Sequence, residues 1–468
     1  MQITNTYELT KLDIVKNSLK LILGKGEIAK VNKLSLRNVF EELVIFHDID
    51  EMASSGYIVI KEQSNLIKNF PVVGWERIDI EFTVTGEDGS PYQPYSNSFY
   101  VYAVDNMNEQ KDIKQYVIRF ASAAAMLNVS SRLEQRYQGK AETILYQIAG
   151  SQVFAGIPNA FILNASIGTK FDLDIIAPSW KPFQFMQRVA SLAVSSDGEF
   201  SDCLLFPQVN GMYEFTSYRT IKARQAVNIV KKPQQVNNGN NNQSAPVIKD
   251  PYTIKEYAIG TLFDNQSFAA GGIYGNIAKM FDFSTMTYET FINYYDKSGK
   301  YSAIPGSQLQ NLGKSDGYNT TEYDLSEIFG NNAKYMFPSE YGSQRRYYGI
   351  RQSPEANISF TLCGLDQTSV SNANSSVNGS AHDTPMYAVS RGIPGRRTMK
   401  TQSAVLNLNP CSDLRIGQLV NINMQSGDGD PDNTLYINGQ WFIGKIKYTL
   451  TDTNMNVDIE CFKNTLNV

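Results

Sequence analysis

RIDIEFTVTG, residues 77–86, alternates strictly between apolar and polar side chains. Two sets of side chains fall on opposite faces of an extended chain: Ile78, Ile80 and Phe82 against Asp79, Glu81 and Thr83. Because successive side chains of a strand point to opposite faces, this period of two predicts a strand with one buried face. We expect the Ile/Phe face to fill a core and the Asp/Glu face to point away from it.

Segments on both sides of this stretch have the same character. VFEELVIFHDI and GYIVIKE precede it, and SFYVYAVDNM and KQYVIRFAS follow it, at 39–49, 56–62, 98–107 and 114–122. Gly56 marks a turn before the second of them, and a Pro-Val-Val-Gly turn occupies 71–74. Short strands at regular spacing, joined by Gly, Pro and Asn turns, predict an antiparallel barrel or sandwich.

A second strand-rich block closes the chain. RIGQLVNINM, TLYINGQWFIGKIKYTLT and MNVDIECFKN give at least three further strands at 415–424, 434–451 and 455–464, and the aromatic segment 271–296 is typical of β-structure. The chain therefore has strand-rich blocks at both ends.

Between these blocks the pattern changes at about residue 123. Residues 123–150 hold good helix formers, and Phe185, Val189 and Leu192 recur at helical spacing in 181–195, where Pro182 suits the first turn. CLLFPQ and GMYEFTSYRTI then predict a hairpin. The region 123–220 is thus predicted to be a mixed α+β module.

Two polar stretches contain few apolar side chains that could be buried in a core. Residues 231–250 are rich in Asn, Gln, Gly and Pro, and 367–385 in Ser, Asn and Gly. Both are interpreted as linkers or exposed loops. The predicted division is a first barrel in 1–122, the mixed module in 123–220, further strands of a second barrel with insertions in 221–385, and its closing strands in 386–468.

Composition limits the class of protein. A chain of 468 residues suggests about three domains. With 42% hydrophobic and 19% charged residues, it is globular, not disordered. The net charge of -4 argues against tight non-specific binding to duplex nucleic acid, which needs clustered positive charge. The opening residues lack the apolar core of a signal peptide, and no apolar run is long enough to span a membrane.

The sequence offers little for catalysis or metal binding. The two histidines, His47 and His382, have no activated nucleophile near them in sequence, and no phosphate-binding loop is present. The four cysteines are isolated, which predicts reduced core thiols and no local zinc site. We therefore predict no catalytic, cofactor-binding or metal-binding residues, although a pair of carboxylates of the glycosidase type stays possible.

One acidic loop resembles part of a calcium site. Asp428, Asp430 and Asp432 have the spacing of the first three ligands of an EF-hand. Asn433 stands where that loop needs glycine, and Gly439 where it needs glutamate. A polar hairpin turn is the preferred interpretation.

The segment 38–82 resembles the opening domain of baseplate hub proteins of contractile-tailed bacteriophages. The segment begins with a strand that contains acidic residues, and a strand that starts with glycine follows. A turn that ends in Pro-Val-Val-Gly and a strand with alternating side chains complete it. The matching residues are Glu42, Leu43, Phe46, Asp48, Ile49, Gly56, Asn65, Leu66, Pro71, Gly74, Glu76 and Ile78.

Two further segments are similar to the same family. The closing strands match through Gly417, Tyr436, Gly439, Phe442 and Ile443, and the helix with its following hairpin matches over 175–220. These motifs are structural signatures, not reactive sites. Residues 231–270 and 297–385 match nothing in the family.

The resemblance implies a structural subunit with two tail-tube-like antiparallel barrels, a mainly β fold with α+β insertions. Three subunits would form a ring that joins a six-fold tail tube to a three-fold central spike. Its partners would be tail tube protein, a separate spike chain and other baseplate proteins, in a virion tail assembled in the host cytoplasm. No enzyme activity and no cofactor are implied.

Such a ring has two physical requirements. Exposed sheet edges must be joined across subunits, and head-to-tail contacts must close after three copies. DNA must also slide through the channel without being held, which needs a neutral or acidic wall. The Asp79/Glu81 face of 77–86 is one hypothesis for that wall, and a plain solvated outer face is the equal alternative.

Two other functions stay open from the sequence. One is the hub of a related contractile injection system. The other is a tail-associated protein that binds or degrades glycans, which would need a cleft with two carboxylates about 5–9.5 Å apart. A ring seen in the microscope would favour a hub, and glycan hydrolysis the enzyme.

Overall fold

The structure is a computed structural model. It describes residues 6–16, 32–63, 66, 70–86, 89–110, 113–198, 201–231, 252–261, 275–282, 287–295, 301–305, 358–363, 399–400, 402–424 and 438–463. The fold is mainly β, with antiparallel pairing dominant and few helices, as predicted. No helix in these ranges has both the length and the apolar composition to cross a membrane.

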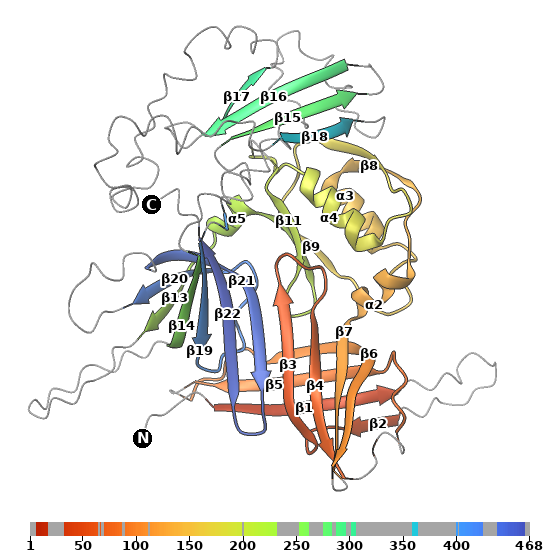
Figure 1. The fold of residues 1–468 in the computed structure, drawn as a ribbon, viewed down its shortest axis with the longest axis vertical. Helices are drawn as coiled ribbons and strands as arrows, with labels where there is room; N and C mark the ends of the chain where they lie inside the picture. Colours follow the sequence, from red (N-terminus) through yellow and green to blue (C-terminus); the bar gives the residue numbers. More distant parts are fainter. Residues whose placement is uncertain are drawn as a thin grey trace, which may run out of the picture.

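The first strand block contains the alternating segment 77–86. Its strands are β1 (Thr6–Lys16), β2 (Asn32–Ser35), β3 (Phe40–Asp48), β4 (Ser55–Glu62), β5 (Arg77–Thr85), β6 (Tyr95–Gln110) and β7 (Ile113–Ser122). All neighbours pair antiparallel in the order β3-β4-β7-β6-β5-β1-β2. The sheet curls, so that β1 and β5 cross behind β3, β4 and β7 (Figure 1). Ile78, Ile80 and Phe82 are fully buried inside this curl, which confirms the predicted core face.

The second block comes from the later part of the chain. It comprises β13 (Val227–Lys231), β14 (Ile254–Thr261), β19 (Gln402–Leu408), β20 (Leu419–Met424), β21 (Gly439–Leu450) and β22 (Met455–Lys463). The order β14-β19-β22-β21-β20-β13 returns to its start through a parallel bridge between Val230 and Thr253. This block therefore closes on itself. Its β13–β20 pair is parallel, an exception to the antiparallel expectation.

The middle of the chain forms a separate mixed module. Its elements are α2 (Ala123–Ser130), β8 (Arg136–Lys140), α3 (Ala141–Ala149), β9 (Leu163–Ala165), β10 (Asp172–Ile176), α4 (Pro182–Leu192), β11 (Cys203–Pro207), β12 (Tyr213–Ser217) and α5 (Tyr218–Lys222). The predicted helix over 181–195 is confirmed as α4, with Pro182 in its first turn and Phe185, Val189 and Leu192 buried. The helical prediction for 123–150 holds for α2 and α3 but not for 131–140, where β8 pairs with β10.

The predicted hairpin after α4 is present but shorter than expected. β11 and β12 pair antiparallel, and β12 ends at Ser217, where α5 begins. The Ser217 hydroxyl accepts a hydrogen bond from the Thr220 backbone N–H at 3.1 Å. Serine favours the helix N-cap for this reason, so SYRTI is helical and not extended.

Five strands of the large sheet had no counterpart among the individual strands expected from the sequence: β1, β2, β13, β14 and β19. β1 has a register shift between Leu9 and Lys11, so its buried residues Leu9, Leu12 and Ile14 do not keep the two-residue period. A separate four-stranded sheet consists of β15 (Gly275–Asp282), β16 (Thr287–Tyr295), β17 (Tyr301–Pro305) and β18 (Ile358–Cys363), which agrees with the β-prediction for 271–296.

Several expectations concern residues outside the described ranges. They include the polar stretches, apart from Lys231, as well as His382, Asn65, Tyr436 and the Asp428/Asp430/Asp432 loop. Of the cysteines, Cys203, Cys411 and Cys461 are buried, as predicted for core thiols. The domain boundaries stay a prediction, with β13 and β14 inside 221–385 and β19 to β22 inside 386–468.

Candidate functional site: the junction of the two strand blocks

The two strand blocks meet in one hydrogen-bonded ladder. β3 of the first block pairs antiparallel with β21 of the second, from Asp48 opposite Lys445 to Leu43 opposite Leu450. The two blocks therefore belong to a single sheet of thirteen strands in the described part of the chain. A ladder of this length holds the blocks in a fixed register, because a slip by one residue would turn every core side chain outward.

β21 changes partner at Gly444. Its first residues pair with β20, its later residues pair with β3, and the ladder with β22 is interrupted between Ile443 and Lys445. The Gly444 carbonyl accepts a hydrogen bond from the Ile49 N–H at 2.8 Å. A Cβ at position 444 would lie 2.1 Å from the Phe462 ring, so glycine lets the ring lie against the backbone at this point.

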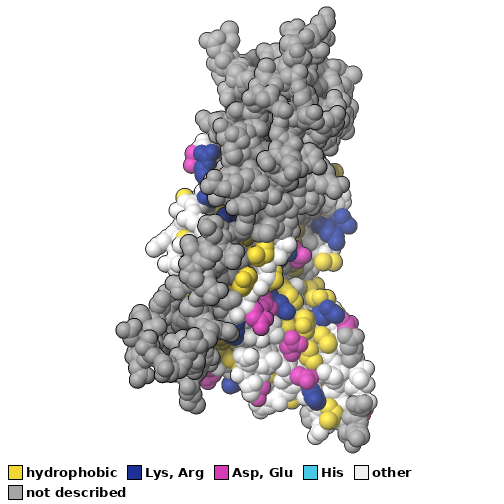
Figure 2. Space-filling view, turned by 60° about the vertical axis from the view of Figure 1, so that its left-hand side comes forward, with side chains coloured by type: hydrophobic (Ala, Val, Ile, Leu, Met, Phe, Trp, Pro, Cys, Tyr) yellow, Lys and Arg dark blue, Asp and Glu magenta, His cyan; other side chains and the backbone are white. Residues whose placement is uncertain are grey.

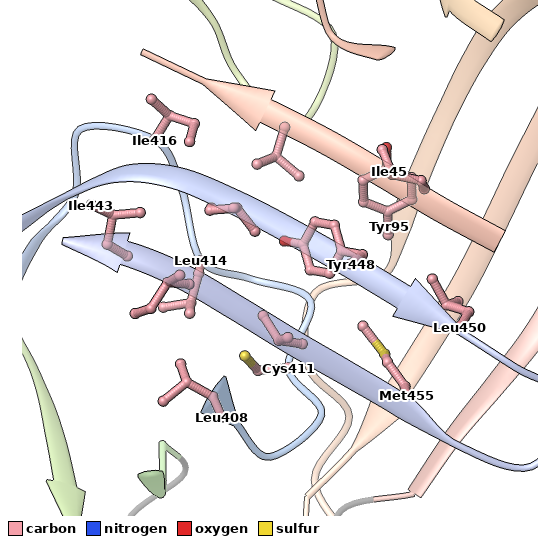
Figure 3. Packing of buried hydrophobic residues seen from close by; sticks show 14 of the residues in the cluster. Ile45, Tyr95, Leu408, Cys411, Leu414, Ile416, Ile443, Tyr448, Leu450 and Met455 are labelled. Carbon is pink, nitrogen blue, oxygen red and sulfur yellow. The ribbon is translucent and has the colours of Figure 1, made fainter. Parts of the chain in front are cut away.

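Aromatic rings fill the junction from both blocks. Tyr448 of β21 is fully buried, and its ring centroid lies 5.7 Å from that of Phe82 and 5.6 Å from that of Tyr95. Figure 3 shows Tyr448 beside Tyr95 and Ile45, with Ile443 farther along the same strand. The two blocks therefore share one continuous hydrophobic core.

His47 belongs to this aromatic cluster. It is 1% exposed, and its Nδ1 lies 2.8 Å from the Ser54 hydroxyl oxygen. Burial lowers the pKa of His47 to about 3, so the ring is neutral at physiological pH. The described residues also contain no cluster of His, Cys, Asp and Glu able to hold a metal ion.

The outward side of the junction carries charges of both signs. Lys445 lies 3.6 Å from Asp48 of β3 and 3.0 Å from Glu460 of β22, and Lys447 lies 3.9 Å from Asp458. Each acid thus has a lysine as a cross-strand neighbour, and such pairs are mutually favourable. Figure 2 shows the described part of one face, where acidic and basic side chains are interspersed with hydrophobic ones.

The Asp79/Glu81 face of β5 differs from the expectation. Asp79 is 7% exposed, because Ser98, Arg77 and Lys11 surround its carboxylate. Glu81 is partly exposed and pairs with Lys11 at 2.9 Å. Asp79 therefore does not belong to an open wall of negative charge, and the channel hypothesis based on this face is corrected. The neighbouring strands β1 and β6 supply the groups that cover it.

Asp79 gives a prediction for the pH dependence of stability. Burial alone raises the pKa of Asp79, but the Ser98 hydrogen bond and the Arg77 and Lys11 cations outweigh burial and hold this pKa below its ordinary value. The carboxylate therefore stabilises the fold above the unfolded-state pKa of about 3.9, and this contribution is lost as the pH falls through the folded-state pKa. We expect Asp79→Asn to lower the free energy of unfolding by about 1–2 kcal/mol near neutral pH.

Urea unfolding at a series of pH values tests this expectation. The difference between wild type and Asp79→Asn should be constant near neutral pH and should shrink below about pH 4. Glu81→Gln is the matched control, because its exposed ion pair contributes little. A difference that persists unchanged in acid would show that the carboxylate charge at Asp79 does not stabilise the fold.

The mixed module is attached to the second block by buried polar contacts. Arg224 pairs with Glu214 and donates to the Gly417 carbonyl at 3.0 Å. Gln208 donates to Glu214 and to the Ile416 carbonyl at 2.9 Å. Gly417 has φ 71°, a left-handed conformation that favours glycine. These contacts hold the β11–β12 hairpin against the loop that leads into β20.

Some residues of the family resemblance lie at the junction. Phe46 and Asp48 lie on β3, and Ile443 lies one residue before the Gly444 bend of β21. Gly56 is the second residue of β4 and pairs with Ile45 of β3. Tyr448 and Gly444 were missed, because neither their residue types nor their spacing in sequence shows that β21 leaves its own block.

Comparisons with known proteins give structural similarities only. No protein-family model matches the chain, and no curated protein matches it at a significant level. A tail protein from Neisseria meningitidis MC58 is 10% identical, with a TM-score of 0.48, and 98% of this chain and 97% of that chain are covered. The 43 kDa tail protein of prophage MuSo2 from Shewanella oneidensis is 13% identical, with a TM-score of 0.44 and coverage of 98% and 100%. A Francisella PdpA–VgrG complex is 9% identical, with a TM-score of 0.46 and coverage of 100% and 54%.

Proposed function

We propose that this chain is a non-enzymatic structural subunit of a contractile phage tail, the baseplate hub. Three copies form a ring that joins a six-fold tail tube to a three-fold spike and leaves a channel for DNA. One observation carries the proposal: β3 and β21 unite both strand blocks in one sheet. Three chains with two strand blocks each would present six blocks to the six-fold tail tube. These six blocks must lie at fixed intervals, so the two blocks of each chain need a rigid link.

The ends of this sheet also suit a ring. β2 ends the strand order among the described strands, whereas β14 is joined to β13 by the bridge at its start, and most side chains of β14 are exposed. A strand at the edge of a sheet carries backbone donors and acceptors available for pairing with another chain. Subunit contacts at the two ends would cover these edges.

The channel wall in this proposal is the outward side of the junction. There Lys445 and Lys447 face Asp48, Glu460 and Asp458 across neighbouring strands. Two lysines against three acids give no excess of positive charge. DNA binds proteins mainly through clustered Lys and Arg, so this surface would let DNA pass without holding it.

The native mass of the purified chain tests the proposal. We expect a trimer by native mass spectrometry, ring-shaped particles by negative-stain microscopy, and co-assembly with tail tube protein and spike protein from the same tail. A chain that stays monomeric in all three experiments would refute the hub function. Release of reducing sugar from host glycans would favour the glycan-degrading alternative.

A further inference from the structure

The turn between β3 and β4 carries an apolar side chain that is buried in a different part of the molecule. This β3–β4 turn comprises residues 49–54, with the sequence IDEMAS. Asp50 and Glu51 are exposed, whereas Met52 is 4% exposed. The Met52 side chain belongs to the hydrophobic core of the mixed module, and Ala53 packs against the same core. A residue of the first block thus completes the core of the module.

Backbone carbonyls of the β3–β4 turn accept hydrogen bonds from the mixed module. The Tyr213 hydroxyl of β12 donates to the Met52 carbonyl at 3.0 Å, and the Gln187 side-chain amide of α4 donates to the Asp50 carbonyl at 3.2 Å. Tyr213 is 1% exposed, and its ring stacks on Phe161 with the ring centroids 3.9 Å apart. Because the Tyr213 ring is fixed in a packed core, its hydroxyl holds the turn in one place.

The same turn also binds the second strand block. The Ile49 N–H donates to the Gly444 carbonyl at 2.8 Å, where β21 changes partner. Ile49 is 2% exposed and belongs to the core that the two blocks share. The Asp50 carboxylate pairs with Lys400, and the Lys400 ammonium group lies 5.0 Å from the centroid of the Phe462 ring. The turn is therefore bound on one side by the module and on the other by the junction of the blocks.

The chain between these two attachments is short. Figure 1 shows the turn at the upper ends of β3 and β4, between these strands and the mixed module. Three residues of chain separate Ile49 from Met52, and three residues extend over about 10 Å at most. Both side chains lie in close-packed cores, which transmit a displacement instead of absorbing it. A shift of Met52 must therefore move the Ile49 backbone as well.

We propose that the β3–β4 turn is a mechanical coupler, which ties the position of the mixed module to the β3–β21 junction. A displacement of the module would move Met52 through its core contacts and through Tyr213, and Ile49 would pass this displacement to the Gly444 bend. Coupling of this kind travels through contiguous packed side chains and hydrogen bonds. A partner that binds the module would thereby change the relative position of the two strand blocks. The inference goes beyond the proposed function, since it concerns a single chain.

Hydrogen–deuterium exchange of the full chain tests the coupler. Met52→Ala removes the side chain that anchors the turn in the module. We expect the amide hydrogens of Ile49 and of residues 444–450 to exchange about ten-fold faster than in wild type, because the ladder at the junction opens more often. Ile144→Ala is the matched control, since Ile144 is fully buried in the same core but lies on α3. The control should speed exchange within the module and leave Ile49 and 444–450 unchanged.

Tyr213→Phe is a milder variant, which tests the coupler even if Met52→Ala does not fold. It keeps the ring and removes the hydroxyl that binds the Met52 carbonyl. The circular dichroism spectrum should be unchanged, and exchange at Ile49 should be about five-fold faster, as for the loss of one hydrogen bond. Wild-type exchange at Ile49 in Tyr213→Phe, or equal acceleration there in Ile144→Ala and Met52→Ala, would overturn the coupler. Either result would leave the hub function standing, because the native mass tests that function separately.

Discussion

Gly56→Ala is expected to lower the free energy of unfolding by about 3 kcal/mol, a large effect for one added methyl group. A Cβ at position 56 would lie 2.2 Å from the Val44 carbonyl oxygen and 2.5 Å from the Phe120 ring. Val44 contributes backbone of the adjacent β3, and Phe120 is fully buried, so neither can move without disturbing the core. The ring of Phe120 lies over Gly56 directly across the β4–β7 ladder.

Chemical denaturation of wild type and variant measures this loss. Gly156→Ala is the matched control, because its added Cβ would meet only the Leu127 side chain at an ordinary 3.8 Å. The control should be neutral or slightly stabilising, since alanine restricts the unfolded chain more than glycine does. Equal denaturation midpoints for Gly56→Ala and wild type would show that the close packing between β3, β4 and β7 is not as described.

Tyr448→Ala is expected to destabilise the protein by about 3–5 kcal/mol. The substitution would leave a cavity between the two strand blocks, where the Tyr448 ring packs edge-on against Phe82 and Tyr95. Both blocks line this cavity, so both should unfold together at a lower denaturant concentration. Intrinsic fluorescence and far-ultraviolet circular dichroism should report the same shifted midpoint.

Tyr448→Phe separates the ring from its hydroxyl. The Tyr448 hydroxyl is buried and has no hydrogen-bond partner among the described residues. Removing it keeps the packing and removes an unsatisfied polar group, so this variant should be as stable as wild type or more stable. A large loss in Tyr448→Phe would mean that the hydroxyl, and not the ring, holds the junction together.

These two positions bear on the proposed function in different ways. Gly56 lies inside the first block, whereas Tyr448 lies between the blocks. A variant of Tyr448 that still folds should therefore alter the relative position of the blocks and weaken ring assembly. Gly56→Ala should act through folding alone.

Local pattern was enough to predict much of this molecule. The two-residue period of 77–86 predicted which side of β5 is buried, and helical spacing with Pro182 predicted α4. Isolated cysteines predicted buried thiols, as found for Cys203, Cys411 and Cys461. Each of these properties depends on neighbours within a few residues, which a sequence displays directly.

The properties that the sequence did not show arise from contacts between distant segments. The pairing of β3 with β21, the bend at Gly444 and the burial of Asp79 by Lys11 and Ser98 all join residues that no local pattern connects. The Glu76 carboxylate binds the N–H groups of the turn before the left-handed Trp75, and the Trp75 N–H donates to Val101 of β6. Strand order, register and the enclosure of a charge follow from the free energy of the whole packed sheet, and they become definite when the distant strands meet.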